Sequence, residues 1–558
     1  MNECVTNCVT AEDIREMATT HQLRKPVESR RALRHRKKTL AFAMILALGA
    51  AAALTLLLIG CGGGTVAPVS APPPPAVQPL QAADVQNIVQ AAVNSVNVDM
   101  VVAVVDRAGF VLGVFRTQNA PTTATGNLGQ SQDANDLAVA LARTGAFFSN
   151  DQAPLSSRTV RFISGIHFPP GVANQPPADL YGIENTNRGC TLVNSAAFQS
   201  EIPPSLALGG GFGLGVITGK ADAMDSNPDS VNPGGVPIFF QNVVVGGIGV
   251  VTASPNLNVA EYAALVGATS QRAGAGASFG PTPASPGVVF IGGIALPFVN
   301  QTSLPAGFSA GPVAGTGSYL VAPANSQGQP PEGDLIAPAA GPLGGLSASD
   351  VTQILSNAEA TANTTRAAIR LPIGSTTRMV IAVADLDGTI IGLRRMSDST
   401  VFSIDVAVTK ARNMVYFNSS SRTPADLNGV PMGTAVTNRT IGFGAEPLYP
   451  PGINGSSSGP FFNLYTMDLA NPCTQGFQGG APNANKSGIV FFPGSAGLYR
   501  GGVLVGGLGV SGDGVDQDDY VTNGGTAGFE APANIRADQI MDEGVRLPYF
   551  KFPRNPTD

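Results

Sequence analysis

Residues 379–395 read MVIAVADLDGTIIGLRR, and this stretch decides the fold. An apolar run of strand length leads to Asp385 and Gly388, which occupy the first and fourth positions that a type I turn favours, and a second apolar run follows. The pattern predicts a tight β-hairpin. Residues 100–116, MVVAVVDRAGFVLGVFR, repeat it, including the Asp and the Gly of the turn. The chain therefore contains two copies of one hairpin.

Similar segments surround the two hairpins in the same order. LQAADVQNIVQAA begins at Leu80 and LSASDVTQILSNA at Leu346, and their apolar residues recur three and four apart, which predicts amphipathic helices. Ser347 and Asp350 match a capping box at the start of the second one. Each hairpin is followed by another helical pattern, a Gly-rich pair of strands and a last helix. This order predicts an α+β fold with antiparallel sheets and helices packed on them.

The amino-acid composition excludes several classes of protein function. The chain has 558 residues, and 32 Lys and Arg against 38 Asp and Glu give a net charge of −6, which excludes a typical nucleic-acid-binding protein. Three histidines and five cysteines leave too few ligands for zinc modules. The 68 Gly and 44 Pro residues predict long loops between the elements.

The chain divides into five regions by pattern. We expect a cytoplasmic or signal region at 1–61, a Gly- and Pro-rich tether at 62–79, a first domain at 80–300, a linker at 301–345, and a second domain with a C-terminal extension at 346–558.

The N-terminal region predicts export and a membrane anchor. Residues 40–60 are 21 uncharged, largely apolar residues after a basic run, long enough to span a bilayer. The junction before Cys61 resembles a bacterial lipobox, so a lipid on Cys61 is one form of the anchor and a retained transmembrane helix is the other. Gly62 in place of Asp favours the outer membrane or cell surface, with the periplasmic face of the inner membrane as the alternative.

These repeats resemble the GlcG/HbpS-like haem-binding proteins, whose domain is often labelled haem-degrading. The resemblance is carried by the Leu-x-x-x-Asp-Val helix, the V-A-V-x-D-x-x-G hairpin, the helix end with Lys410 and Arg412, and VGGLGVSGDGVDQDDYV at 505–521. The second copy matches better, because Leu141 takes the place of Lys410 in the first.

The resemblance implies a profilin-like fold with about five antiparallel strands flanked by helices in each repeat. Proteins of this family bind haem or related tetrapyrroles and assemble as dimers or higher oligomers. A tandem chain would form such a dimer internally, as a pseudo-twofold pair, and a homo-oligomer is a further expectation.

Haem needs an axial donor for its iron and cations for its propionates. The candidates are His167, Tyr449, Lys410 and Arg412. His167 is the only histidine beyond the signal region, and a loop histidine without a role is the alternative. Lys410 and Arg412 lie two apart on a helix and therefore diverge, which favours solvated or ion-paired side chains.

Three further features each have two interpretations. Cys190 and Cys473 follow Tyr181 and Tyr465 by nine and eight residues, so a disulfide between equivalent positions and two free thiols are both open. The Gly-rich strands allow close approach by a helix or by a flat ligand, and helix packing is favoured. The aspartates of 513–519 and of 222–229 suggest calcium, but the start of a helix also favours acidic residues.

The sequence favours a binding protein over an enzyme. No Ser-His-Asp or Cys-His set can be assembled around a single exported histidine. We therefore expect an exported, membrane-anchored protein that binds haem without catalysis. The alternative is a cell-surface structural or partner-binding scaffold that has lost the ligand pocket.

Overall fold

A computed structural model describes residues 77–186, 216–280, 288–420, 422–470 and 487–557. Pro75–Asp558 form one compact unit, and the description below concerns this unit. The apolar segment 40–60 and Cys61 lie outside the described residues, as do Cys190 and Cys473. Within the described ranges, no helix has the length and apolar character needed to cross a membrane.

Each repeat builds a five-stranded antiparallel sheet. The first has the order β5-β6-β1-β2-β9 and the second the order β10-β12-β11-β14-β13, so corresponding strands occupy corresponding places. The first sheet comprises β1 (Met100–Asp106), β2 (Val111–Arg116), β5 (Gly235–Phe240), β6 (Val243–Thr252) and β9 (Ser318–Val321). The second comprises β10 (Gly333–Ile336), β11 (Val380–Ala384), β12 (Ile390–Arg395), β13 (Ser495–Arg500) and β14 (Val503–Ser511).

The predicted hairpins form with the predicted turns. The N–H of Gly109 donates to the Asp106 carbonyl over 3.0 Å, and that of Gly388 donates to the Asp385 carbonyl over 2.9 Å. Both glycines have positive φ, which an L-residue adopts only at a cost. The local sequence therefore fixes the central strand pair of each sheet.

The segment 301–345, assigned to a linker by its sequence, supplies an edge strand to each sheet. It contains β9, which pairs with β2, and β10, which pairs with β12. It also contacts both hairpin turns. The Asp106 carboxylate accepts N–H groups from Gln327 and Gly328, and the Asp385 carboxylate accepts those of Leu343 and Gly344. This segment thus completes both sheets.

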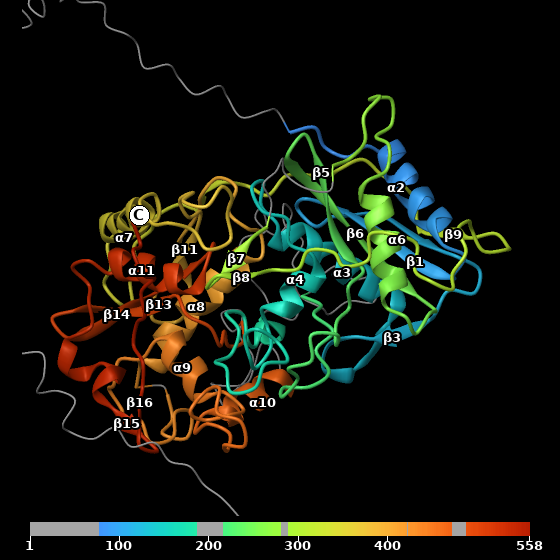
Figure 1. The fold of residues 1–558 in the computed structure, drawn as a ribbon. Helices are drawn as coiled ribbons and strands as arrows, with labels where there is room; N and C mark the ends of the chain where they lie inside the picture. Colours follow the sequence, from blue (N-terminus) through green and yellow to red (C-terminus); the bar gives the residue numbers. More distant parts are fainter. Residues whose placement is uncertain (1–76, 187–215, 281–287, 421, 471–486, 558) are drawn as a thin grey trace, which may run out of the picture. The chain divides into compact units, whose positions relative to one another are not determined.

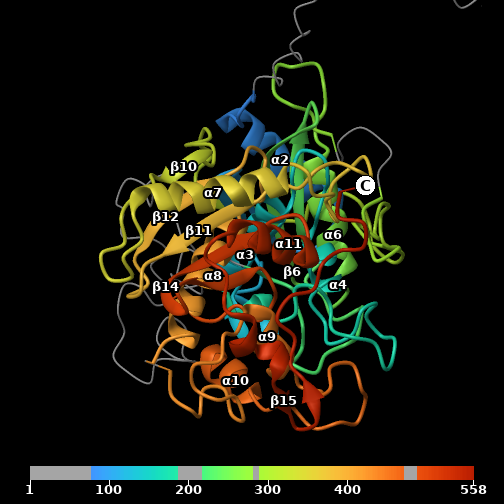
Figure 2. The same ribbon diagram turned by 90° about the vertical axis from the view of Figure 1, so that its left-hand side faces the viewer.

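Helices cover both faces of each sheet. On the first sheet, α2 (Ala82–Ser95) and α6 (Asn258–Ala268) pack on one face and α3 (Ala134–Phe148) on the other. On the second, α7 (Ala348–Ala362) and α11 (Val515–Gly525) take the place of α2 and α6, and α8 (Ser403–Phe417) that of α3. Figure 1 shows α2 and α6 together on the first sheet, and Figure 2 shows α7 along the second.

Shorter elements complete the described part. They are α4 (Ser157–Phe162), α9 (Asn438–Gly444) and α10 (Phe462–Ala470), with hairpins β3 (Thr123–Thr125) and β4 (Ser131–Asp133), β7 (Phe290–Ile291) and β8 (Ile294–Ala295), and β15 (Met541–Asp542) and β16 (Val545–Arg546). Four 3-10 turns are η1 (Asn127–Gly129), η2 (Ile183–Asn185), η3 (Ala533–Ile535) and η4 (Ala537–Gln539). The capping box of Ser347 and Asp350 forms as predicted.

The strand glycines serve helix packing, as the sequence favoured. A Cβ added to Gly507 or Gly509 of β14 would overlap a backbone carbonyl of α8, and one added to Gly247 or Gly249 of β6 would overlap a carbonyl of α3. The absence of side chains at these positions lets each helix lie directly on its sheet.

One core runs through both repeats. Side chains of α3, α8 and the sheet faces beneath them belong to a single hydrophobic cluster. Within it the rings of Phe148 and Phe402 stack with centroids 4.0 Å apart. The equivalent tyrosines Tyr181 and Tyr465 also stack on each other, at 5.4 Å. The predicted α+β fold of two helix-flanked antiparallel sheets is confirmed, and the repeats pack together as a pair.

Candidate functional site

Lys410 takes part in a buried ion pair that stabilises the fold. Its ammonium is fully buried and donates to the Val510 carbonyl over 2.8 Å and to the Asp518 carboxylate over 3.0 Å. Burial lowers the pKa of Lys410, and the charge of Asp518 opposes that shift. The side chain ties α8 to β14 and α11. It is ion-paired, one of the two states that the sequence favoured.

Arg412 diverges from Lys410, as predicted. Its Nε donates to the Gly388 carbonyl in the hairpin turn over 3.0 Å, and another nitrogen bonds to the Ser487 hydroxyl. Burial lowers its pKa to about 10, which leaves it charged at neutral pH. Arg143 makes the same contact in the first repeat, with two bonds to the Gly109 carbonyl. Arg412 therefore supports the hairpin.

Tyr449 has its hydroxyl committed to the backbone. The hydroxyl donates to the Asp542 carbonyl over 3.2 Å. Burial raises the pKa of Tyr449 to about 12, so the phenolate that would bind iron is disfavoured. The hydroxyl of Tyr449 therefore contacts β15, and Tyr449 is not among the residues that line the His167 pocket.

The four aspartates of 513–519 that were considered for calcium are paired with cations. Asp513 pairs with Arg370 over 2.7 Å, and Asp519 with Arg439 over 2.5 Å. Asp516 pairs with Arg439 too, and Asp518 with Lys410. Among the residues that the structure describes, no group of three or more His, Cys, Asp or Glu side chains is placed to hold a metal ion.

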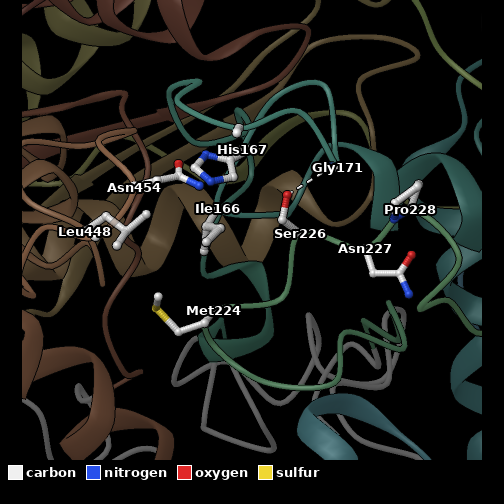
Figure 3. Close-up of a pocket in the computed structure, with 11 residues that line it drawn as sticks. Ile166, His167, Gly171, Met224, Ser226, Asn227, Pro228, Leu448 and Asn454 are labelled. Atoms are coloured by element: carbon white, nitrogen blue, oxygen red, sulfur yellow. Dashed lines mark hydrogen bonds between the residues drawn. The ribbon is translucent and has the colours of Figure 1, made fainter.

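His167 lines a pocket of about 460 Å³ that both repeats build. Its side chain comes from the loop after α4, and only 3% of the residue is exposed. The lining residues are Ile166, His167, Gly171, Ala173, Met224, Ser226, Asn227, Pro228, Leu448, Asn454 and Gly455. Figure 3 shows the His167 ring above Ile166, with Asn454 and Leu448 of the second repeat on the same side of the view.

The hydrogen bond at Nδ1 sets the tautomer of the neutral His167 ring. Its Nδ1 lies 2.7 Å from the Gln175 carbonyl, which can only accept a hydrogen bond. Nδ1 therefore carries the proton, and Nε2 of the neutral ring keeps its lone pair, the tautomer that metal-binding histidines adopt. The loop is held by hydrogen bonds from Phe168 to Pro176 and from Ala178 to Gly165.

Met224 also lines this pocket, and sequence reasoning missed it. It is 49% exposed and belongs to the loop whose aspartates suggested calcium. Asp225 of that loop pairs with Arg161 over 3.1 Å and accepts N–H groups from Ala221 and Asn227. Burial acts to raise the pKa of Asp225, but these hydrogen bonds outweigh it, and the pKa is lowered. Asp225 thus holds the loop that carries Met224.

The structure does not unite the four predicted haem contacts. His167 lines the pocket, whereas Lys410, Arg412 and Tyr449 are engaged elsewhere. The eleven lining residues include no Lys or Arg. The predicted disulfide between Cys190 and Cys473 stays a prediction, because both lie outside the described residues.

Comparison with known proteins places the resemblance in the second repeat. Residues 346–527 match the family described as haem degrading protein HbpS-like. A crystal structure of a PduOC–haem complex is 22% identical, covers 34% of this chain and 96% of its own, and has a TM-score of 0.22. The Klebsiella pneumoniae protein ORFY is 18% identical, with 33% and 90% covered and a TM-score of 0.21. No curated protein matches the chain.

Proposed function

Because residues 346–527 match the HbpS-like haem-degrading family, we propose that this protein binds haem or a related tetrapyrrole, with His167 as an axial ligand. The observation that carries the proposal is the hydrogen bond between Nδ1 of His167 and the Gln175 carbonyl. It leaves the lone pair of Nε2 available to a metal, and His167 lines a pocket of about 460 Å³. This volume lies within the range of about 300–1,000 Å³ that is usual for small-molecule sites.

The residues of the pocket fit the needs of haem iron. Imidazole nitrogen and thioether sulfur are both axial donors of haem proteins, and His167 and Met224 supply one of each. Ile166, Pro228 and Leu448 offer apolar surface for a macrocycle. Bound haem would supply an iron centre with a strong visible absorbance. Without a cation in the lining, recognition would rest on ligation and apolar contact.

Both repeats take part in the proposed site. His167 and Met224 come from the first repeat, whereas Leu448 and Asn454 come from the second, which carries the family match. The pocket therefore requires the paired arrangement of the repeats. This dependence supports a binding role for the tandem chain as a whole.

Export and membrane attachment are a further part of the proposal. The uncharged segment 40–60 and the lipobox-like junction at Cys61 support it. Metabolic labelling with a radioactive fatty acid should mark the wild-type chain and not Cys61→Ser. A chain that stays in the membrane fraction without label would indicate the retained helix instead.

Hemin titration of the purified 558-residue chain tests the haem proposal. We expect a saturable shift of the Soret band with about one equivalent bound. His167→Ala should weaken binding at least about tenfold, the loss of one metal ligand. Met224→Leu, at a half-exposed position, should alter the spectrum if sulfur is the second ligand.

Tyr449→Phe is the matched control and should leave the titration unchanged, because its hydroxyl serves the backbone of Asp542. An unaltered Soret shift in a folded His167→Ala variant would remove His167 from the site. No saturable shift in the wild-type chain would instead favour the structural or partner-binding scaffold.

A further inference from the structure

A larger cavity, of about 700 Å³, lies between the repeats and shares no lining residue with the His167 pocket. The first repeat contributes Phe168, Asp179 and Tyr181 to its wall, and the β7 hairpin contributes Ile291 and Ile294. Most of the remaining lining comes from the second repeat and the C-terminal segment. The cavity is therefore a separate feature of the paired fold.

Four cationic side chains line this cavity, and they differ in whether a carboxylate pairs with them. Arg439 is tied to Asp516 and Asp519, and Lys551 pairs with Asp516 over 2.8 Å. Arg366 and Arg554 form no ion pair with a carboxylate of the described residues. One Arg366 nitrogen donates to the Arg554 carbonyl over 3.2 Å. Two guanidinium groups thus keep donors for an anion.

Aromatic rings and apolar side chains form the rest of the wall. The rings are Phe168, Tyr181, Phe443, Phe491 and Phe492. Rings of this kind favour another ring in offset or edge-to-face contact. Glu446 also lines the cavity, is 5% exposed, and forms no salt bridge with a described residue. The cavity thus combines a ring-binding wall with cations.

Arg366 comes from a connection that is longer than its counterpart in the first repeat. Residues 363–379 join α7 to β11, whereas residues 96–99 suffice between α2 and β1, and Arg366 lies in the longer connection. Arg370 of the same connection is buried and bonds to Asp513 over 2.7 Å and, across the repeats, to Gln152 over 2.8 Å. The connection is therefore anchored, and Arg366 lies on a supported backbone.

We propose that this cavity is a binding site for a small aromatic carboxylate or sulfonate, with Arg366 and Arg554 on the anionic group and the aromatic wall on the ring. Guanidinium groups bind such anions through paired N–H donors. Burial of the ring in the cavity removes apolar surface from water, and this adds a favourable hydrophobic contribution to the free energy of binding. The site uses neither His167 nor Met224, so it goes beyond the haem-binding proposal.

Isothermal titration of the 558-residue chain with 2-naphthalenesulfonate tests this site. We expect saturable binding at one equivalent, and at least about tenfold weaker binding of uncharged 2-naphthamide, since a guanidinium prefers an anion. The double variant Arg366→Gln/Arg554→Gln should weaken 2-naphthalenesulfonate binding at least about tenfold. Arg546→Gln, an exposed arginine outside the lining, is the matched control and should bind as the wild type does.

His167→Ala separates this site from the haem site. It should leave 2-naphthalenesulfonate binding unchanged even where it abolishes the hemin shift. Equal affinity for the sulfonate and the amide, or full affinity in a folded Arg366→Gln/Arg554→Gln variant, would overturn the proposal. Stoichiometric displacement of the sulfonate by hemin in the His167→Ala variant would also overturn it, because haem would then be the occupant of the cavity.

Discussion

Asn174 and Asn454 exchange two hydrogen bonds, in which the backbone N–H of each donates to the side-chain Oδ1 of the other, over 2.8 and 2.9 Å. Each residue follows the Pro-Pro-Gly turn of its own repeat. Reciprocal contacts of this kind are the mark of a twofold relationship. The stack of the equivalent residues Tyr181 and Tyr465 obeys the same rule. The repeats are thus related by a local pseudo-twofold axis.

The Asn174–Asn454 exchange should appear as an energetic coupling. Each single Ala variant removes one Oδ1 acceptor and so breaks one bond of the pair directly, which loosens the ring that the two bonds close. Each should lower the free energy of unfolding by about 0.5–1 kcal/mol, and the double variant should lose less than the sum of the two. Urea unfolding followed by far-UV circular dichroism measures the cycle. Fully additive losses would contradict the pairing.

Lys410 should matter for stability and not for hemin affinity. Lys410→Ala leaves Asp518 buried without its cation, and breaking a buried pair in this way costs about 3–5 kcal/mol. Lys551→Ala is the control, because Lys551 is largely exposed beside Asp516 and should lose less than about 1 kcal/mol. Urea unfolding measures both variants. Similar small losses in the two would show that the Lys410 pair is dispensable.

Gly509→Ala should destabilise the second repeat. The added Cβ would overlap the Ala407 carbonyl and push α8 away from β14, and overpacking of this kind costs about 1–3 kcal/mol. Gly328→Ala meets only Phe110 at an ordinary 3.5 Å and should change stability by less than about 0.5 kcal/mol. Thermal unfolding of both variants is the measurement. Equal melting temperatures would contradict direct helix-on-sheet packing.

Binding of 2-naphthalenesulfonate should strengthen as the pH falls. Burial, and then the charge of Asp516, raise the pKa of Asp179 to about 6, against the opposing effects of Lys551 and Arg439. Below that pKa Asp179 is neutral and repels an anion less. Affinity should therefore rise about three- to tenfold from about pH 7.5 to about pH 5.

Asp179→Asn should bind 2-naphthalenesulfonate tightly at both pH values and remove most of this dependence. Glu446 also faces the cavity, and burial raises its pKa well above the usual value. Glu446→Gln is therefore measured in parallel. A pH dependence that persists in Asp179→Asn and disappears in Glu446→Gln would assign the effect to Glu446.

Local patterns predicted the repeats well, because hairpin turns, helix caps and packing glycines are encoded within a few residues. The divergence of Lys410 and Arg412 followed from helix geometry alone. The edge strands β9 and β10 were not predicted, since each has four residues amid Gly and Pro and is defined by its partner strand. The sequence singled out His167, whose part in haem binding stays a prediction, but it gave no signal for Met224, which lines the same pocket only because a distant loop folds there.

The arginine pair of the cavity had no sequence signal. Arg366 and Arg554 are far apart in the chain, and an isolated arginine in a loop is unremarkable. They meet at one cavity only because the connection 363–379 and the C-terminal segment reach the same place. Tertiary packing brings the two arginines to the same cavity, and the spacing of residues in the sequence does not predict this.

The longer connection at 363–379 illustrates what covalent fusion permits. A symmetric homodimer of identical halves must carry every insertion twice, so a loop that improves one side of the axis also burdens the other. Here one chain contains both halves, so the connection in one repeat can be longer than the equivalent connection in the other. The two sides of the axis can thus specialise independently while they share one interior.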